Sequence, residues 1–201
     1  MLDARSDFEG EPDLERLRKA YNALSQNPKE ALVELEALAN AGSKNSMSYL
    51  AYAYKTGVSG KVDRELAEIW YKRGYEAGSL SALMQLSYLY LMTDRYELAE
   101  EILRAGVDRG YSLAIYVLGR NYVFGLRKYK NRIEDLILLK RAASMENIYA
   151  KRDFGYMLMR EEKGVSRRVV GLYTYVIGLL HILLLSLREP DSPRLDMYGI
   201  Y

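Results

Sequence analysis

The sequence predicts an all-α protein, a right-handed solenoid of αα-hairpins that ends in an apolar helix. Three observations predict it. A residue pattern recurs at spacings of 36, 32 and 36 residues, the 201 residues include only four prolines, and an uncharged run of 19 residues lies near the C-terminus. A pattern that recurs at this period is typical of stacked repeats, in which each short unit buries its apolar face against its neighbours.

Composition excludes several classes of function. The chain has no cysteine, which excludes disulfides, thiolate nucleophiles and cysteine-ligated metals. It has one histidine, His181, which excludes a multi-histidine metal site. Carboxylates that are adjacent in sequence, such as Glu100 and Glu101, diverge on a helix and do not converge on one substrate. We therefore predict no enzyme activity, catalytic residue, metal, cofactor or small-molecule substrate.

The N-terminal segment is acidic and lacks the apolar core of a signal peptide, so we expect the bulk of the protein to stay in the compartment where it is made. Residues 1–11 are expected to form a disordered acidic lead-in. Residues 12–42 then form a capping helix pair, and Asn27 followed by Pro28 indicates the start of its second helix.

Residues 43–166 are predicted to hold the repeats. Taking Ser46 as the first position of a unit, four columns recur at offsets of 0, 4, 5 and 8 residues, which fall on one face of a helix. Offset 4 carries large side chains and offset 5 carries small ones, so we expect this face to form the core between paired helices. A second column, Gly42, Gly78 and Gly110, follows the ends of the second helices, where glycine accepts a left-handed backbone.

These residues resemble a known family, the Sel1-like repeats, which are αα-hairpins related to tetratricopeptide repeats. The resemblance rests on the run Leu118, Gly119, Tyr122 and Gly125, and on the unit that ends in Ala77 and Gly78. It covers about residues 30 to 175 and is weaker in the second and fourth units. The resemblance implies a scaffold for protein complexes, since relatives act in membrane-linked quality control, in signalling and in bacterial envelope polysaccharide assembly.

The first helices of stacked αα-hairpins line the concave surface, so residues opposite the core columns are expected to face a protein partner. Tyrosine and arginine are the residue types that anchor interfaces. The alternative is that these are ordinary surface residues. The predicted partner-binding residues are Tyr52, Tyr88, Tyr116, Arg120, Arg152 and Tyr156.

Between Arg127 and Arg168 the chain has 12 lysines and arginines against 6 acidic residues. This excess indicates contact with an anionic membrane surface, or a solvated basic face. The loop from Arg127 to Arg132 interleaves a tyrosine with basic residues, but we do not expect a nucleic-acid partner, because the same sign continues to the edge of the apolar run.

Residues 167–188 form the candidate membrane span. Twelve of the 19 residues from Val169 to Leu187 are Leu, Ile or Val, and the run spans about 28 Å as a helix, close to the hydrocarbon thickness of a bilayer. More basic residues precede the run than follow it, which places the repeats in the cytoplasm and the polar tail, residues 189–201, outside.

A stripe of less apolar residues, Gly171, Thr174, Gly178 and His181, is the predicted seam for a partner span or a second copy. The alternative for His181 is a neutral packed side chain with no chemical role. The alternative for the whole helix is burial in an oligomer of a soluble protein.

The sequence thus predicts a non-enzymatic, membrane-anchored adaptor that binds a protein partner, in envelope polysaccharide assembly or secretion. The second hypothesis is a soluble regulatory or assembly subunit whose last helix is buried in an oligomer.

Overall fold

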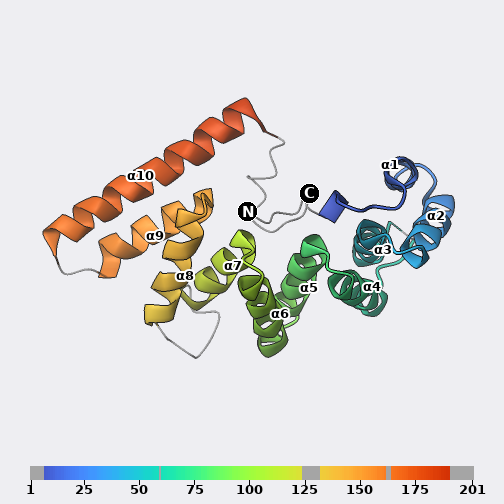
Figure 1. Ribbon diagram of the computed structural model, residues 1–201, viewed down its shortest axis with the longest axis horizontal. Helices are drawn as coiled ribbons and strands as arrows, with labels where there is room; N and C mark the ends of the chain where they lie inside the picture. The colour runs from blue at the N-terminus through green and yellow to red at the C-terminus, as the bar shows by residue number, and fades with distance from the viewer. Residues whose placement is uncertain (1–6, 59, 124–131, 162–163, 191–201) are drawn as a thin grey trace. The chain divides into compact units, whose positions relative to one another are not determined.

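The computed structural model describes residues 7–58, 60–123, 132–161 and 164–190, which are α-helical apart from short connections. Within these ranges no residue is in a β-strand (Figure 1). The prediction of an all-α fold of αα-hairpins is confirmed. The helices are α1 (Leu14–Ala23), α2 (Pro28–Asn40), α3 (Lys44–Thr56), α4 (Arg64–Glu76), α5 (Leu80–Met92), α6 (Tyr96–Asp108), α7 (Ser112–Val123), α8 (Arg132–Ser144), α9 (Ile148–Glu161) and α10 (Val165–Arg188).

The described residues divide into two compact units, residues 7–102 and residues 103–190. In the first unit α1 packs on α2, α2 on α3, α3 on α4 and α4 on α5. In the second unit α7 packs on α8, α8 on α9 and α9 on α10. First helices of successive hairpins also contact one another, α3 with α5 and α7 with α9. Both units are therefore stacks of helix pairs.

Side chains at the helix starts explain where four of these helices begin. Asp13, Ser43, Asp63 and Ser79 each accept a hydrogen bond from the backbone N–H three residues later. These bonds satisfy groups that a helix leaves unpaired at its amino end. Asn27 precedes α2 as predicted, but its side chain makes no such bond; Pro28 opens the helix without it.

The predicted glycine column ends the second helices. Gly42, Gly78 and Gly110 have φ angles of 96°, 89° and 72°. The N–H of the residue after each glycine bonds back to a carbonyl five residues earlier, which closes the helix end. The column continues at Glu146, whose φ is 61°, although glutamate gives no sign of it in the sequence.

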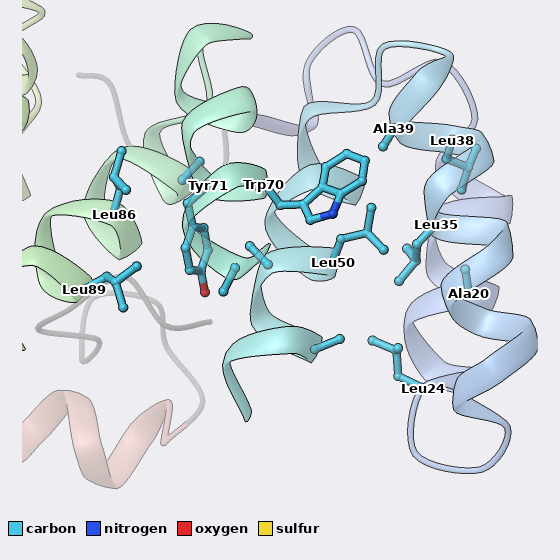
Figure 2. Packing of buried hydrophobic residues seen from close by; sticks show 14 of the residues in the cluster. Ala20, Leu24, Leu35, Leu38, Ala39, Leu50, Trp70, Tyr71, Leu86 and Leu89 are labelled. Carbon is cyan, nitrogen blue, oxygen red and sulfur yellow. The ribbon is translucent and has the colours of Figure 1, made fainter. Parts of the chain in front are cut away.

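The core of the first unit is built from the predicted columns. Leu50, Ala51, Ala82 and Leu86 have no exposed surface, and Trp70 and Tyr71 of α4 pack against them (Figure 2). Offsets 0, 4 and 5 are buried in the second unit as well, in α7. The helix face that carries the recurring columns is therefore the one that is buried against neighbouring helices.

Two of the predicted boundaries need correction. Residues 7–11 are held by hydrogen bonds and Asp7 is buried, so this part of the expected disordered lead-in is ordered; residues 1–6 lie outside the described residues. The apolar helix begins at Val165, two residues earlier than expected. Of the polar tail the structure describes only residues 189–190.

Candidate functional site: the faces of the first helices

The first helices of the first unit carry a stripe of polar and aromatic side chains. Tyr52 of α3 is 36% exposed, and Tyr88 occupies the same position of the repeat on α5, where it is half-buried. The Lys55 ammonium of α3 donates a 2.9 Å hydrogen bond to the side-chain oxygen of Gln85 on α5, a residue that is itself buried. We call Tyr52, Lys55, Gln85 and Tyr88 the α3/α5 stripe.

The ammonium of Lys55 is the most unusual group of the stripe. It lies 5.6 Å from the centre of the Tyr52 ring and 5.8 Å from that of Tyr71, both within the range of a cation–π contact. Burial lowers the pKa of Lys55. A cation that is partly removed from water beside two aromatic rings is suited to bind the carbonyl or carboxylate of a partner.

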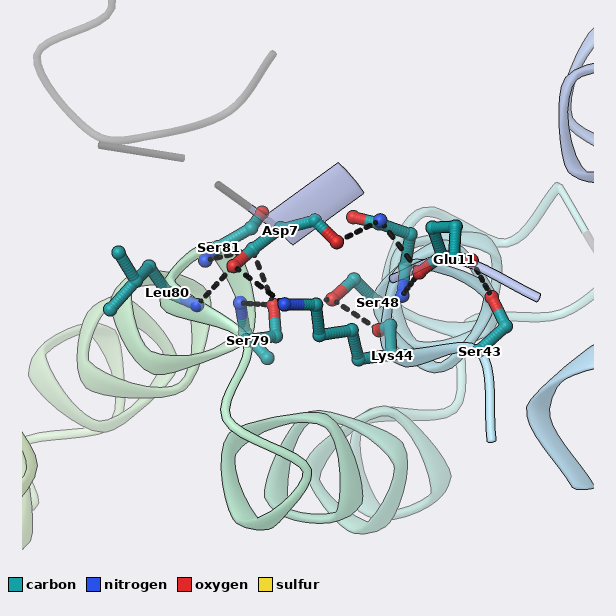
Figure 3. A network of polar contacts seen from close by, with 10 residues as sticks. Asp7, Glu11, Ser43, Lys44, Ser48, Ser79, Leu80 and Ser81 are labelled. Carbon is teal, nitrogen blue, oxygen red and sulfur yellow. Dashed lines mark hydrogen bonds and ion pairs between the residues drawn. The ribbon is translucent and has the colours of Figure 1, made fainter. Parts of the chain in front are cut away.

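Residues 7–11, which we call the acidic segment, cover the amino ends of the same two helices (Figure 3). Asp7 is 1% exposed; its carboxylate accepts hydrogen bonds from the Ser79 hydroxyl at 2.7 Å and from the backbone N–H groups of Leu80 and Ser81 at 2.8 Å. The Lys44 ammonium lies 4.0 Å from the same carboxylate. Asp7 therefore caps the start of α5.

Glu11 does the same at the start of α3. Its carboxylate accepts hydrogen bonds from the Ser43 hydroxyl at 2.6 Å, from the Asn45 backbone N–H at 3.2 Å and from the Asn45 side-chain amide at 2.8 Å. The Asn45 amide also donates to the backbone carbonyl of Asp7 at 2.8 Å. These contacts are not visible in the sequence, because nothing local pairs Asp7 with a helix that begins at residue 80.

In the second unit three of the predicted partner-binding residues converge on Asp153 of α9. The Tyr116 hydroxyl donates to its carboxylate at 2.9 Å, Arg152 pairs with it at 2.6 Å, and Arg120 lies 3.8 Å away. Arg152 and Arg120 keep part of their side chains exposed, whereas Asp153 is buried. The cluster thus brings two guanidinium groups to the one buried carboxylate of Asp153.

Tyr116 is fully buried, so it has no surface to offer a partner. Burial, followed by the nearby Asp153 carboxylate, raises its pKa. Ser48 and Met84 at the same repeat position are buried too, because successive first helices pack on this side. The sequence indicates the burial of this repeat position, because its first two residues, Ser48 and Met84, are small or apolar. Tyr156, by contrast, is 37% exposed, with its ring 6.4 Å from that of Tyr175.

The predicted seam of α10 lies against α9 of the same chain. A Cβ atom on Gly171 would lie 2.8 Å from the Cβ of Leu158, and one on Gly178 would lie 2.7 Å from the backbone nitrogen of Arg152. Thr174 donates its hydroxyl to the Val170 carbonyl at 2.8 Å, and His181 is exposed. The two glycines thus allow close packing of α10 on α9 of the same chain, and His181 lies outside this contact.

The outer side of α10 is apolar and exposed. Among the described residues it is the one helix whose length and composition would allow it to cross a membrane. Large apolar side chains that are at least two-fifths exposed lie along its whole length; they are Val165, Val169, Val170, Leu172, Tyr173, Val176, Leu179, Leu180, Leu183, Leu184 and Leu187.

The described residues contain no group of three or more side chains arranged to hold a metal ion. Several of their carboxylates are engaged in caps and ion pairs, such as that of Glu68 with Lys72 at 2.8 Å and with Arg95 at 2.7 Å. What the arrangement offers is surface for binding: the α3/α5 stripe, the acidic segment beside it, and the arginines of the second unit.

No protein-family model and no curated protein sequence matches the chain. Solved structures do. The chain is similar over 95% of its length to c5321, a protective antigen of uropathogenic Escherichia coli with an SLR fold, at 20% identity and a TM-score of 0.64. It spans about half of that protein, 47% of its length.

A Sel1 repeat protein from Oxalobacter formigenes matches 92% of this chain over 84% of its own, at 18% identity and a TM-score of 0.64. The immunity protein Pa5087 of Pseudomonas aeruginosa matches 98% of the chain over 81% of its own, at 16% identity and a TM-score of 0.52. These likenesses show that the chain has the Sel1-like repeat fold, which confirms the fold expected from the resemblance.

Proposed function

We propose that the protein is a non-enzymatic adaptor that binds a protein partner through the exposed faces of its first helices and is held at a membrane by α10. The observation that carries the proposal is the α3/α5 stripe, which presents Tyr52 beside the partly desolvated Lys55 ammonium and Tyr88 at the same repeat position on the next first helix. Sel1-like and related solenoids use such faces as extended binding surfaces.

The chemistry of the stripe favours a polypeptide partner. Tyr52 and Tyr88 combine an apolar ring with a hydroxyl, a combination that is enriched where interfaces concentrate their binding energy. The half-buried Lys55 ammonium is already held in place by its hydrogen bond to the buried Gln85, so little side-chain entropy is lost when a partner binds it. Arg120, Arg152 and Tyr156 are the corresponding candidates in the second unit.

The adaptor function is tested by a pulldown from native membranes with the full chain. We expect the Tyr52→Ala/Tyr88→Ala/Tyr156→Ala variant to release the specific partner while its helical circular dichroism stays at the wild-type level. Ile69→Ala is the matched control, since Ile69 is exposed on the second helix α4 and lies outside the stripe. Retained binding by the triple variant would refute the proposal.

The membrane attachment is supported by the length and surface of α10. Its 24 residues extend for about 36 Å, enough to cross the hydrocarbon core, and its outer side is a continuous apolar surface. Arg167 and Arg168 at its start, against Arg188 and Glu189 at its end, support an orientation with the repeats in the cytoplasm.

A crossing helix cannot keep its present contacts with α9. Gly178 lies near the middle of α10 and touches the backbone of Arg152, which pairs with Asp153. If α9 accompanied α10 into the bilayer, these charges would lie near its centre, where each costs roughly 2.5–3.5 kcal/mol on insertion scales. The proposal therefore includes separation of α10 from α9 when it inserts.

A second candidate is a soluble regulatory or assembly subunit whose α10 is covered by another subunit, such as a second copy. The observation that favours it is the fit of Gly155, Gly171 and Gly178, through which α10 packs as the second helix of a repeat. Membrane fractionation followed by alkaline extraction separates the two candidates. An inserted helix stays with the lipid, whereas a protein-covered helix is released.

We further propose envelope polysaccharide assembly or secretion as the process that the adaptor serves. The support is the family resemblance of the repeats together with the apolar last helix. The test is deletion of the coding sequence in the source organism, followed by measurement of surface polysaccharide and secreted protein. Unchanged levels of both would remove this part of the proposal and leave the adaptor function standing.

A further inference from the structure

The acidic segment belongs to no repeat, yet it binds two successive repeats in the same way. Ser43 and Ser79 occupy equivalent positions, and each accepts the backbone N–H three residues later while donating its hydroxyl to a carboxylate, that of Glu11 or that of Asp7. Backbone N–H groups of the same helix starts complete each site. Each of the two repeats thus binds one carboxylate, and Asp7 and Glu11, which supply them, are four residues apart in the acidic segment.

These two carboxylate sites extend the α3/α5 stripe to the amino ends of the helices. Asn45 and Tyr52 are seven residues apart on α3, as are Ser81 and Tyr88 on α5, so each pair lies on one side of its helix. Asn45 and Ser81 contact the acidic segment. A polypeptide that follows the stripe toward the amino ends of α3 and α5 therefore meets the acidic segment.

The segment is held by its carboxylates rather than by an apolar anchor. Phe8, Glu9 and Gly10, which lie between Asp7 and Glu11, are exposed. The partners of the carboxylates are hydroxyls, amides and the Lys44 ammonium, none of which depends on the identity of the segment that supplies the charge. A different acidic chain would satisfy the same donors.

We infer that the amino ends of α3 and α5 form a binding site for an acidic polypeptide segment with two carboxylates four residues apart, which residues 7–11 occupy until a partner segment displaces them. This inference rests on the proposed adaptor function and specifies the chemistry of its partner. The two carboxylates of the partner take the places of Asp7 and Glu11, and its chain continues along the α3/α5 stripe.

The test uses the full chain and a labelled, acetylated peptide with the sequence of residues 5–13. In the Asp7→Asn/Glu11→Gln variant the internal competitor is weakened, so the peptide should bind at least about ten-fold more tightly than it binds the wild type. The control variant Glu9→Gln/Glu15→Gln removes the same charge from exposed positions and should behave like the wild type. A peptide with Asn and Gln in place of its Asp7 and Glu11 should not bind.

Hydrogen exchange at the backbone N–H groups of Leu80 and Ser81 gives an independent readout. Exchange should be faster in the Asp7→Asn/Glu11→Gln variant than in the wild type, and the acidic peptide should slow it again. If this variant loses its helical circular dichroism, Glu11→Gln alone replaces it, and a gain in affinity of about three-fold or more is expected. Equal affinity of the variant and the wild type, equal binding of the uncharged peptide, or no binding at all would overturn the inference.

These outcomes are separable from those of the adaptor test. Failure of the peptide to bind, together with loss of the partner in the tyrosine variant, leaves the adaptor function intact and removes the acidic site. If the peptide binds and the triple tyrosine variant still retains the partner, the acidic site is supported and the tyrosines are shown not to belong to the interface.

Discussion

Gly155 of α9 and Gly171 of α10 bring the backbones of the two helices into contact. A Cβ atom on Gly155 would lie 2.7 Å from the carbonyl oxygen of Gly171 and would also collide with the backbone nitrogen of Tyr175. Neither neighbour is the end of a flexible side chain, so a side chain at residue 155 requires the helices to move apart. The helices α9 and α10 can therefore pack this closely only because glycine occupies the contact positions.

Gly155→Ala should therefore lower the free energy of unfolding by about 1–3 kcal/mol, the usual cost of overpacking. Urea unfolding followed by circular dichroism measures it. Gly164→Ala is the control, since no atom lies within 4 Å of a Cβ placed there; because Gly164 is the N-cap of α10 and alanine caps less well, we expect a loss of less than about 1 kcal/mol. Equal effects of the two substitutions would contradict the close packing of α9 on α10.

Glu146→Gly should stabilise the protein. Glu146 has a φ of 61° at the position where earlier repeats have glycine, and a left-handed backbone costs a residue with a side chain roughly 1–2 kcal/mol. After the larger entropy loss of glycine on folding is subtracted, we expect a gain of about 0.5–1 kcal/mol in the free energy of unfolding. Glu101→Gly, at an exposed position inside α6, is the matched control and should destabilise by about 1 kcal/mol.

Stability should fall as the pH rises from about 10 to 12. Burial, followed by the nearby Tyr21 phenol and the Glu11 carboxylate, raises the pKa of Tyr49 to about 12. An unfolded tyrosine loses its proton near pH ~10, so within this window the unfolded chain binds fewer protons than the folded chain and the free energy of unfolding decreases. Its contribution is complete below about pH 10.

Tyr49→Phe should make this decrease shallower, because it removes the phenol whose pKa burial raises. Urea unfolding at a series of alkaline pH values measures the slope. Some slope should remain in the Tyr49→Phe variant, because burial also raises the pKa values of Tyr71 and Tyr116. An unchanged slope in Tyr49→Phe would show that this phenol titrates alike in the folded and unfolded chains.

A disulfide between α9 and α10 should prevent membrane insertion. The chain has no cysteine of its own, so the Leu158→Cys/Gly171→Cys variant can form one bridge. A Cβ on Gly171 would lie 2.8 Å from that of Leu158, so the helices need to part by about 1 Å to reach the ~3.8 Å Cβ separation of a disulfide. Oxidised protein should be released by alkaline extraction and reduced protein retained.

The two single-cysteine variants serve as controls and should be retained under both conditions. Retention of the oxidised double variant would mean that α10 inserts while it is still docked on α9, or that the fraction reflects another attachment. Release of both forms, and of the wild type, would favour the soluble subunit.

The sequence by itself determined the fold. The repeat columns placed Leu50, Ala51 and Leu86 in the core because helical periodicity is a local property, and each hairpin repeats it. The glycine column marked the ends of the second helices for the same reason. The apolar run likewise defined α10 to within two residues at its start.

Only the tertiary structure decided which of the predicted site residues reach the surface. Tyr116 is buried because α7 and α9 pack side by side, and its partner Asp153 lies 37 residues away in the chain. Asp7 meets a helix that begins 73 residues later. Gly171 and Gly178 meet α9 of their own chain. Contacts of this kind depend on how separate helices stack. The repeating pattern shows which face of each helix packs on its neighbours, but it does not show that the acidic segment, which is not part of a repeat, binds across the helix ends.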